Sequence, residues 1–161
     1  FPIKFASAKG RVKMIQKDAS LETFIPFWLN QLTSKVNEQL AERLSEIGIS
    51  VPQWRVLSIL HSFGSMSIGK ISELAVINQS TLSRVIDQLE RSNLVSRTPL
   101  PENKRVIEVS LTDLGERTFS EIFPVASELH SFMESQLTEI EREAFFSISH
   151  KLILALQVRK K

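Results

Sequence analysis

The sequence contains no cysteine among its 161 residues. Disulfide bonds, thiolate zinc sites and redox sensing through a thiol are therefore excluded for this chain. The three histidines, His61, His130 and His150, fall on separate predicted helices without metal-ligand spacing. Patterns of a Ser-His-acid triad, a phosphate loop or a metal site are also missing. We therefore expect neither a metal nor another cofactor, and no enzyme activity.

Long apolar runs are missing as well. No run approaches the roughly 18–20 residues that a membrane span requires. The N-terminus lacks the apolar core of a signal peptide. We expect a cytoplasmic protein with no membrane partner.

A large excess of one charge sign is absent, because the net charge is only +2. The positions of the cations are more informative than their total. Residues 1–20 form a basic N-terminal arm, with Lys4, Lys9, Arg11, Lys13 and Lys17 against Asp18. The arm either packs on this chain or a neighbour without a chemical role, or touches a nucleic-acid backbone. Because the chain begins without Met, we also expect that the arm was trimmed or carries residues added in cloning.

The first half of the chain has the periodicity of amphipathic helices. Between residues 22 and 47 apolar side chains recur every three or four positions, at Ile25, Trp28, Leu29, Leu32, Val36, Leu40, Leu44 and Ile47. Ser50 and Gln53 form a capping box for a second helix that ends at Gly64. Ser67 then caps a short third helix, which should bury Ile68, Ile71 and Leu74.

The next segment predicts a helix followed by a β-hairpin. Asn78 caps the fourth helix, whose core stripe is Leu82, Val85, Ile86 and Leu89. Asn93 suits a left-handed helix end. Two strand-like runs follow, at residues 94–97 and 106–109, and we expect Pro99 and Pro101 to keep the hairpin tip out of regular pairing.

Two more helices complete the chain. Thr112 caps a fifth helix, which we expect to kink at Pro124. Thr138 and Glu141 form a capping box for the sixth. The predicted fold class is therefore mainly α with a small β-wing.

This order of elements is typical of a winged helix-turn-helix, which makes DNA binding the leading hypothesis. We assign residues 49–111 to the DNA-binding region, and residues 21–48 and 112–161 to dimerisation helices of one intertwined domain. The terminal helices are too long for a minimal DNA-binding domain, and their apolar stripes need a partner surface. A homodimer satisfies this need; a monomeric bundle that buries the same stripes internally is the alternative.

The candidate DNA contacts lie on the fourth helix and on the hairpin. Short polar donors and acceptors at the start of the helix suit base edges in the major groove. The hairpin carries cations suited to the minor groove or the phosphates. The candidates are Gln79, Ser80, Thr81, Ser83, Arg84, Arg97, Lys104 and Arg105. The alternatives are a solvated helix face and an ordinary surface turn.

Several motifs resemble the multiple-antibiotic-resistance regulator (MarR) family. They are residues 53–57 (QWRVL), 83–90 (SRVIDQLE), 94–97 (LVSR), 103–105 (NKR) and 109–115 (VSLTDLG). The resemblance covers about residues 22–158. It implies a homodimer of winged-helix subunits that binds a pseudo-palindromic operator, and small molecules that often release the DNA. The family's wing usually carries Asp-x-Arg, whereas here Asn103 precedes Arg105.

The resemblance also implies a site for a small-molecule effector, and we expect it between the first, second and fifth helices. Candidate lining residues are Trp28, Trp54, Arg55, His61, Phe63 and Phe123, each of which could equally be a core or rim residue. The expected function is a sequence-specific transcriptional regulator, and more narrowly a repressor. The alternative is a winged-helix module that binds protein and not DNA.

Overall fold

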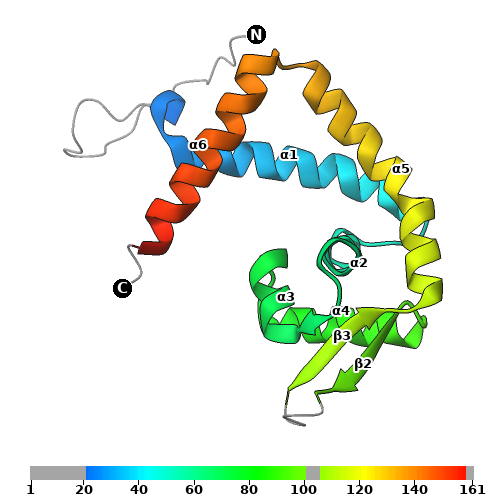
Figure 1. Ribbon diagram of the computed structural model, residues 1–161. Helices are drawn as coiled ribbons and strands as arrows, with labels where there is room; N and C mark the ends of the chain where they lie inside the picture. Colours follow the sequence, from blue (N-terminus) through cyan, green and yellow to red (C-terminus); the bar gives the residue numbers. More distant parts are fainter. Residues whose placement is uncertain (1–20, 101–105, 159–161) are drawn as a thin grey trace, which may run out of the picture. The chain divides into compact units, whose positions relative to one another are not determined.

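The computed structural model describes residues 21–100 and 106–158 (Figure 1). Its contacts divide the chain into two units, residues 1–36 and 37–161, and α1 (Ile25–Ser45) runs across the boundary. In the first unit the short 3-10 helix η1 (Leu21–Thr23) precedes α1. The indole N–H of Trp28 donates to the carbonyl of Glu22 at 2.8 Å, which attaches α1 to the segment before it.

The second unit is mainly helical, as the sequence predicts. After α1 come α2 (Val51–Phe63), α3 (Ile68–Ala75), α4 (Gln79–Arg91), α5 (Asp113–Ser135) and α6 (Glu139–Val158). Figure 1 shows α2 end-on, with α3, α4 and the sheet gathered around it. The fold class of helices with a small β-wing is confirmed.

The predicted helix caps are present. Ser50 and Gln53 exchange hydrogen bonds at the start of α2, and Ser67 and Thr112 accept from the backbone of α3 and α5. At α6 the backbone N–H and the hydroxyl of Thr138 both donate to Glu141, each at 2.8 Å. These two hydrogen bonds, the backbone one first, hold the pKa of the exposed Glu141 carboxyl below its ordinary value. Local sequence therefore sets where these helices begin.

A three-stranded antiparallel sheet completes the unit, in the order β1 (Met66–Ser67), β3 (Ile107–Leu111), β2 (Val95–Pro99). The two-residue strand β1 was not predicted; Met66 pairs with Val109 far along the chain. The prediction that Pro99 lies outside the regular strand pairing was wrong, because Pro99 ends β2 in register with Ile107. Pro101 lies outside the described residues.

The core lies where α2, α3, α4 and the sheet meet. Eight side chains are almost completely buried there: Leu44, Val56, Leu57, Ile71, Leu82, Ile86, Leu89 and Val109. Burying a Leu, Ile or Val side chain stabilises a fold by about 1.5–3 kcal/mol. The prediction that Leu74 is buried was wrong, because Leu74 is 39% exposed and is not part of this core.

The apolar side chains of the terminal helices are largely exposed. Along α6 these are Ile140, Phe145, Phe146, Ile148, Ile153, Leu154, Leu156 and Val158. Along α1 they are Ile25, Trp28, Leu29 and Leu32. Within the described residues, none of the helices has the length and apolar character to cross a membrane.

The first turn of α5 crosses the start of the hairpin at very close range. The hydroxyl of Thr112 donates to the carbonyl of Asn93, and the backbone N–H of Thr112 donates to the carbonyl of Leu94 at 3.1 Å. A Cβ on Gly115 would lie only 2.0 Å from the carbonyl oxygen of Leu94. Only a glycine allows this approach.

We predict that Gly115→Ala destabilises the fold by about 1–3 kcal/mol, because the new methyl overlaps backbone that cannot move away cheaply. Urea unfolding at fixed protein concentration measures the change. Gly69→Ala is the matched control, since a Cβ there meets only the Gln79 amide at 3.7 Å. The helix propensity of Ala should stabilise this control slightly. Equal stability of the two variants would contradict the proposed overlap.

Candidate nucleic-acid interface

The N-terminal turn of α4 presents polar side chains to solvent. Asn78 is its cap, and the Oδ1 atom of Asn78 accepts from the backbone N–H of Thr81 and from the hydroxyl of Ser80, each at 2.9 Å. Gln79, Ser80 and Thr81 are all exposed. On the opposite side of the helix, Leu82, Val85, Ile86 and Leu89 are buried. The buried stripe therefore fixes which residues face outward.

Two further candidates, Ser83 and Arg84, lie one turn along α4 and differ in exposure and in hydrogen bonding. The hydroxyl of Ser83 donates to the carbonyl of Gln79 at 2.9 Å, and Ser83 is half-buried. Arg84 is exposed and makes no hydrogen bond or ion pair within residues 21–100 and 106–158. Arg84 is thus the more available of the two for an external anion or base.

Arg97 at the base of the hairpin is paired inside the protein. Its guanidinium donates to Asp87 at 2.6 Å and to Glu90 at 2.8 Å, and its side chain is only 26% exposed. Both carboxylates belong to α4, so this arginine links strand β2 to that helix. These ion pairs indicate a positioning role, and the DNA contact of Arg97 stays a prediction.

Sequence reasoning missed Asp87 and Glu90 as functional residues. Their spacing of three places both carboxylates on one side of α4. An acidic pair on a helix, followed by one arginine on the next strand, is the sequence pattern that could have predicted these ion pairs. Without Arg97, the two carboxylates would repel an approaching phosphate backbone.

The other strand of the wing is attached to the segment after α2. The hydroxyl of Ser65 donates to Glu108 on β3 at 2.9 Å, and the hydroxyls of Ser96 and Ser110 lie 3.0 Å apart across the hairpin. The predicted tip contacts Lys104 and Arg105, with Asn103, lie outside the described residues.

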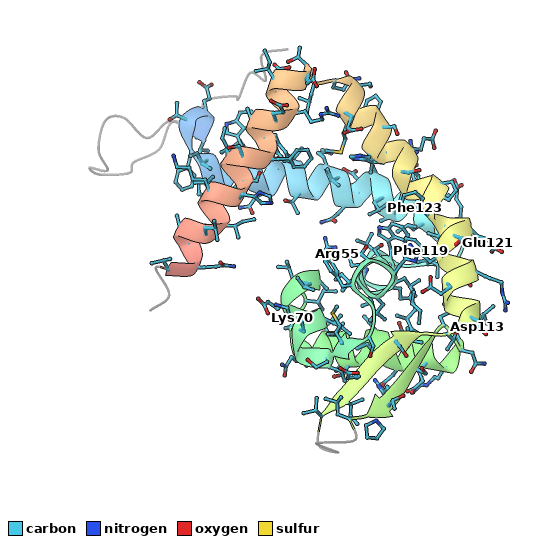
Figure 2. The ribbon with its side chains drawn as sticks, viewed as in Figure 1. Arg55, Lys70, Asp113, Phe119, Glu121 and Phe123 are labelled. Atoms are coloured by element: carbon cyan, nitrogen blue, oxygen red, sulfur yellow. The ribbon has the colours of Figure 1, made fainter. Side chains whose placement is uncertain are left out.

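Some of the predicted effector residues meet in a cluster of rings between α2 and α5. Phe119 lies at its centre, with its ring 5.3 Å from Trp54, 4.0 Å from His61 and 5.6 Å from Phe123. His61 also lies 2.8 Å from a carboxylate oxygen of Glu116. Figure 2 shows Phe119 on the side of α5 that faces α2, and Glu121 on the outer side. Phe119 itself was not predicted as part of this group.

The remaining effector candidates are not part of this cluster. Arg55 donates to Asn37 at 2.9 Å and to the carbonyl of Ala75 at 3.3 Å, which links α2 to α1 and to the end of α3. Phe63 is 67% exposed at the end of α2, and Trp28 belongs to the first unit.

An open hollow of about 590 Å³ lies where α1 ends and α2 begins. It is lined by Ala41, Ser45, Gly48, Ile49, Ser50, Val51, Pro52 and Gln53. None of the six predicted effector residues lines it, so their role stays a prediction.

Comparison with known proteins gives consistent matches. Residues 49–107 match the model of the MarR family. The chain is 32% identical to the HTH-type transcriptional repressor IacR of Pseudomonas putida, over 74% of this chain and 72% of that protein. It is 31% identical to the HTH-type transcriptional repressor MdtR of Bacillus subtilis, over 83% of this chain and 86% of that protein.

Solved structures share the fold. A MarR-family transcriptional regulator from Silicibacter pomeroyi superposes with a TM-score of 0.77 at 29% identity, over 87% of this chain and 94% of that one. A mutant of MarR from E. coli complexed with operator DNA gives 0.72 at 22% identity, over 84% and 99%. BpsR of Bordetella bronchiseptica, whose DNA binding is regulated by 6-hydroxynicotinic acid, gives 0.74 at 21% identity, over 83% and 96%.

We predict that Arg97→Ala and Asp87→Asn are coupled in stability by about 0.5–1 kcal/mol, because each removes the same half-buried ion pair. A double-mutant cycle in urea unfolding measures the coupling. The control pair is Lys70 and Glu73 on α3, whose side chains are 52% and 64% exposed. That pair should couple weakly, and an equally weak coupling for Arg97 would rule out its linking role.

Proposed function

Because the chain belongs to the MarR family, we propose that it represses transcription as a homodimer bound to a pseudo-palindromic operator. As a member of that family, it is a winged helix-turn-helix transcriptional regulator that binds DNA, and not an enzyme. The observation that carries the proposal is the helix α4, which buries one apolar side, exposes a polar N-terminal turn and is joined to the wing by Arg97.

We propose that the N-terminal turn of α4 enters the major groove. That groove is about 12 Å wide and admits one helix. Gln79, Ser80 and Thr81 then face base edges, and Ser83 contributes less because its hydroxyl is used within the helix. Arg84 reaches a guanine edge or a phosphate.

The wing supplies the second set of proposed contacts. Lys104 and Arg105 at its tip reach the minor groove or the phosphates. Arg97 contributes indirectly, because it holds β2 against α4 and neutralises Asp87 and Glu90. In this chain Asn103 stands where the family usually has an Asp, so the side-chain carbonyl of Asn103 or the carboxylate of Glu102 would orient Arg105.

The proposed dimer is supported by the exposed apolar side chains of the terminal helices. Many large apolar side chains exposed along one helix, as on α6, are typical of an interaction site. A two-fold dimer would cover it, and would also present two copies of α4 to successive turns of one DNA face. Residues 21–48 and 112–161 would supply this interface, and residues 49–111 would bind DNA.

We further propose that the protein acts in the cytoplasm and that a small molecule controls its DNA binding. The effector would bind beside the rings of α2 and α5, against Trp54, Arg55, His61, Phe63 and Phe123. The half-exposed Phe123 and the exposed His61 offer an apolar and a polar surface there. BpsR, whose DNA binding is regulated by 6-hydroxynicotinic acid, is an example of such control in a protein of this fold.

We predict that Arg84→Ala weakens binding to the operator about ten-fold or more and weakens binding to random DNA much less. A bidentate contact to guanine contributes about 1–3 kcal/mol of discrimination. Titration of both duplexes, with the operator located by footprinting upstream of the protein's own gene, tests this. Arg117→Ala, which removes an exposed cation on α5, is the control. Equal weakening on the two duplexes would show that Arg84 contacts only phosphate. No binding of the unaltered protein to any duplex would instead favour a protein-interaction module.

We predict a mass of two 18.3 kDa chains in light scattering at low micromolar concentration. Phe145→Glu with Ile148→Glu should shift the mass toward one chain, because the two carboxylates would be desolvated in the interface. Ser147→Glu adds a carboxylate to the same helix at a polar position, and should leave the mass unchanged. A one-chain mass for the unaltered protein would contradict the dimer.

A further inference from the structure

Val76 occupies an unfavourable backbone conformation in the turn between α3 and α4. Its φ and ψ are 54° and 45°, in the left-handed region. Within the described residues only Asn93 shares a positive φ among residues other than glycine. Asn adopts this region readily, whereas a β-branched side chain crowds the backbone there.

The turn is held by contacts that do not involve the Val76 side chain. The hydroxyl of Ser72 donates to the carbonyl of Ile77 at 2.6 Å, and the backbone N–H of Ile77 donates to the carbonyl of Ser72 at 3.2 Å. Arg55 donates to the carbonyl of Ala75, and the residue Ala75 is buried. The surrounding structure therefore imposes the conformation on residue 76 whatever its side chain.

Within residues 21–100 and 106–158, the side chain of Val76 is too exposed for packing to offset this conformation. Its side chain is 84% exposed, whereas its neighbour Ile77 packs against the core. A turn of this kind often contains glycine, which adopts the left-handed region without crowding. An exposed valine at this position is therefore explained better by a contact outside the chain than by folding.

The position of Val76 beside the N-terminus of α4 points to DNA as the molecule that its side chain contacts. It lies two residues before the cap Asn78 and three before Gln79, so it continues the surface that we propose reads DNA. We propose that Val76 packs against apolar carbon of the operator, either a thymine methyl group or a deoxyribose. This inference rests on the proposed function, and apolar side chains are known to contact the thymine methyl in this way.

Val76→Gly should improve folding and impair binding at once. We expect the thermal midpoint to rise by about 2–4 °C, because relief of the left-handed strain outweighs the entropy that glycine adds to the unfolded chain. We expect operator affinity to fall about five-fold or more, because two methyl groups leave the interface. Val76→Asn is the matched variant, since it suits the left-handed region but is polar, and it should bind as weakly as the glycine variant.

The outcomes separate this inference from the proposed function. Operator affinity of Val76→Gly equal to that of the unaltered protein, or a lower thermal midpoint, would overturn the role of Val76 alone. No DNA binding by the unaltered protein would overturn both. An operator with deoxyuridine in place of thymidine identifies the partner carbon. If Val76 contacts a thymine methyl, this operator weakens the unaltered protein but not Val76→Gly, and if it contacts a deoxyribose, both proteins respond alike.

Discussion

Leu82, Val85, Ile86 and Leu89 lie on one side of α4, and each is at most 7% exposed. Their burial against the rest of the core fixes the rotation of this helix about its axis. Since side chains three and four apart share a face, that rotation alone decides that Gln79, Ser80 and Arg84 point outward. The proposed DNA-reading surface is thus a consequence of core packing, and a change in the core would rotate or loosen it.

The wing depends on the same helix. Arg97 ties β2 to Asp87 and Glu90 on α4, and Gly115 lets α5 cross the start of β2 at a distance that no other residue would allow. These two contacts limit how far the wing can move relative to α4. Arg97 also cancels negative charge next to the surface that we propose approaches phosphate, so one side chain would serve both geometry and electrostatics.

The sequence predicted correctly those features that depend on neighbouring residues alone, namely the helix caps and the buried side of α4. The caps Ser50, Asn78 and Thr138 and the buried stripe of α4 follow from residue type and spacing, and all were predicted. The strand β1, the pairing of Arg97 and the central place of Phe119 were not. Each depends on residues far apart in sequence that the fold brings together, such as Met66 with Val109. Periodicity carries no information about such pairs.

Helix α6 shows how folding and assembly are connected in this chain. It has a capping box at Thr138, but none of its residues is fully buried, and most of its large apolar side chains are exposed. Helices in water gain most of their stability by packing an apolar face, and capping adds only about 1 kcal/mol. In the proposed dimer, the second chain would supply the packing that stabilises α6. In that case the stability of this region depends on protein concentration, and assembly and folding of α6 are parts of one equilibrium.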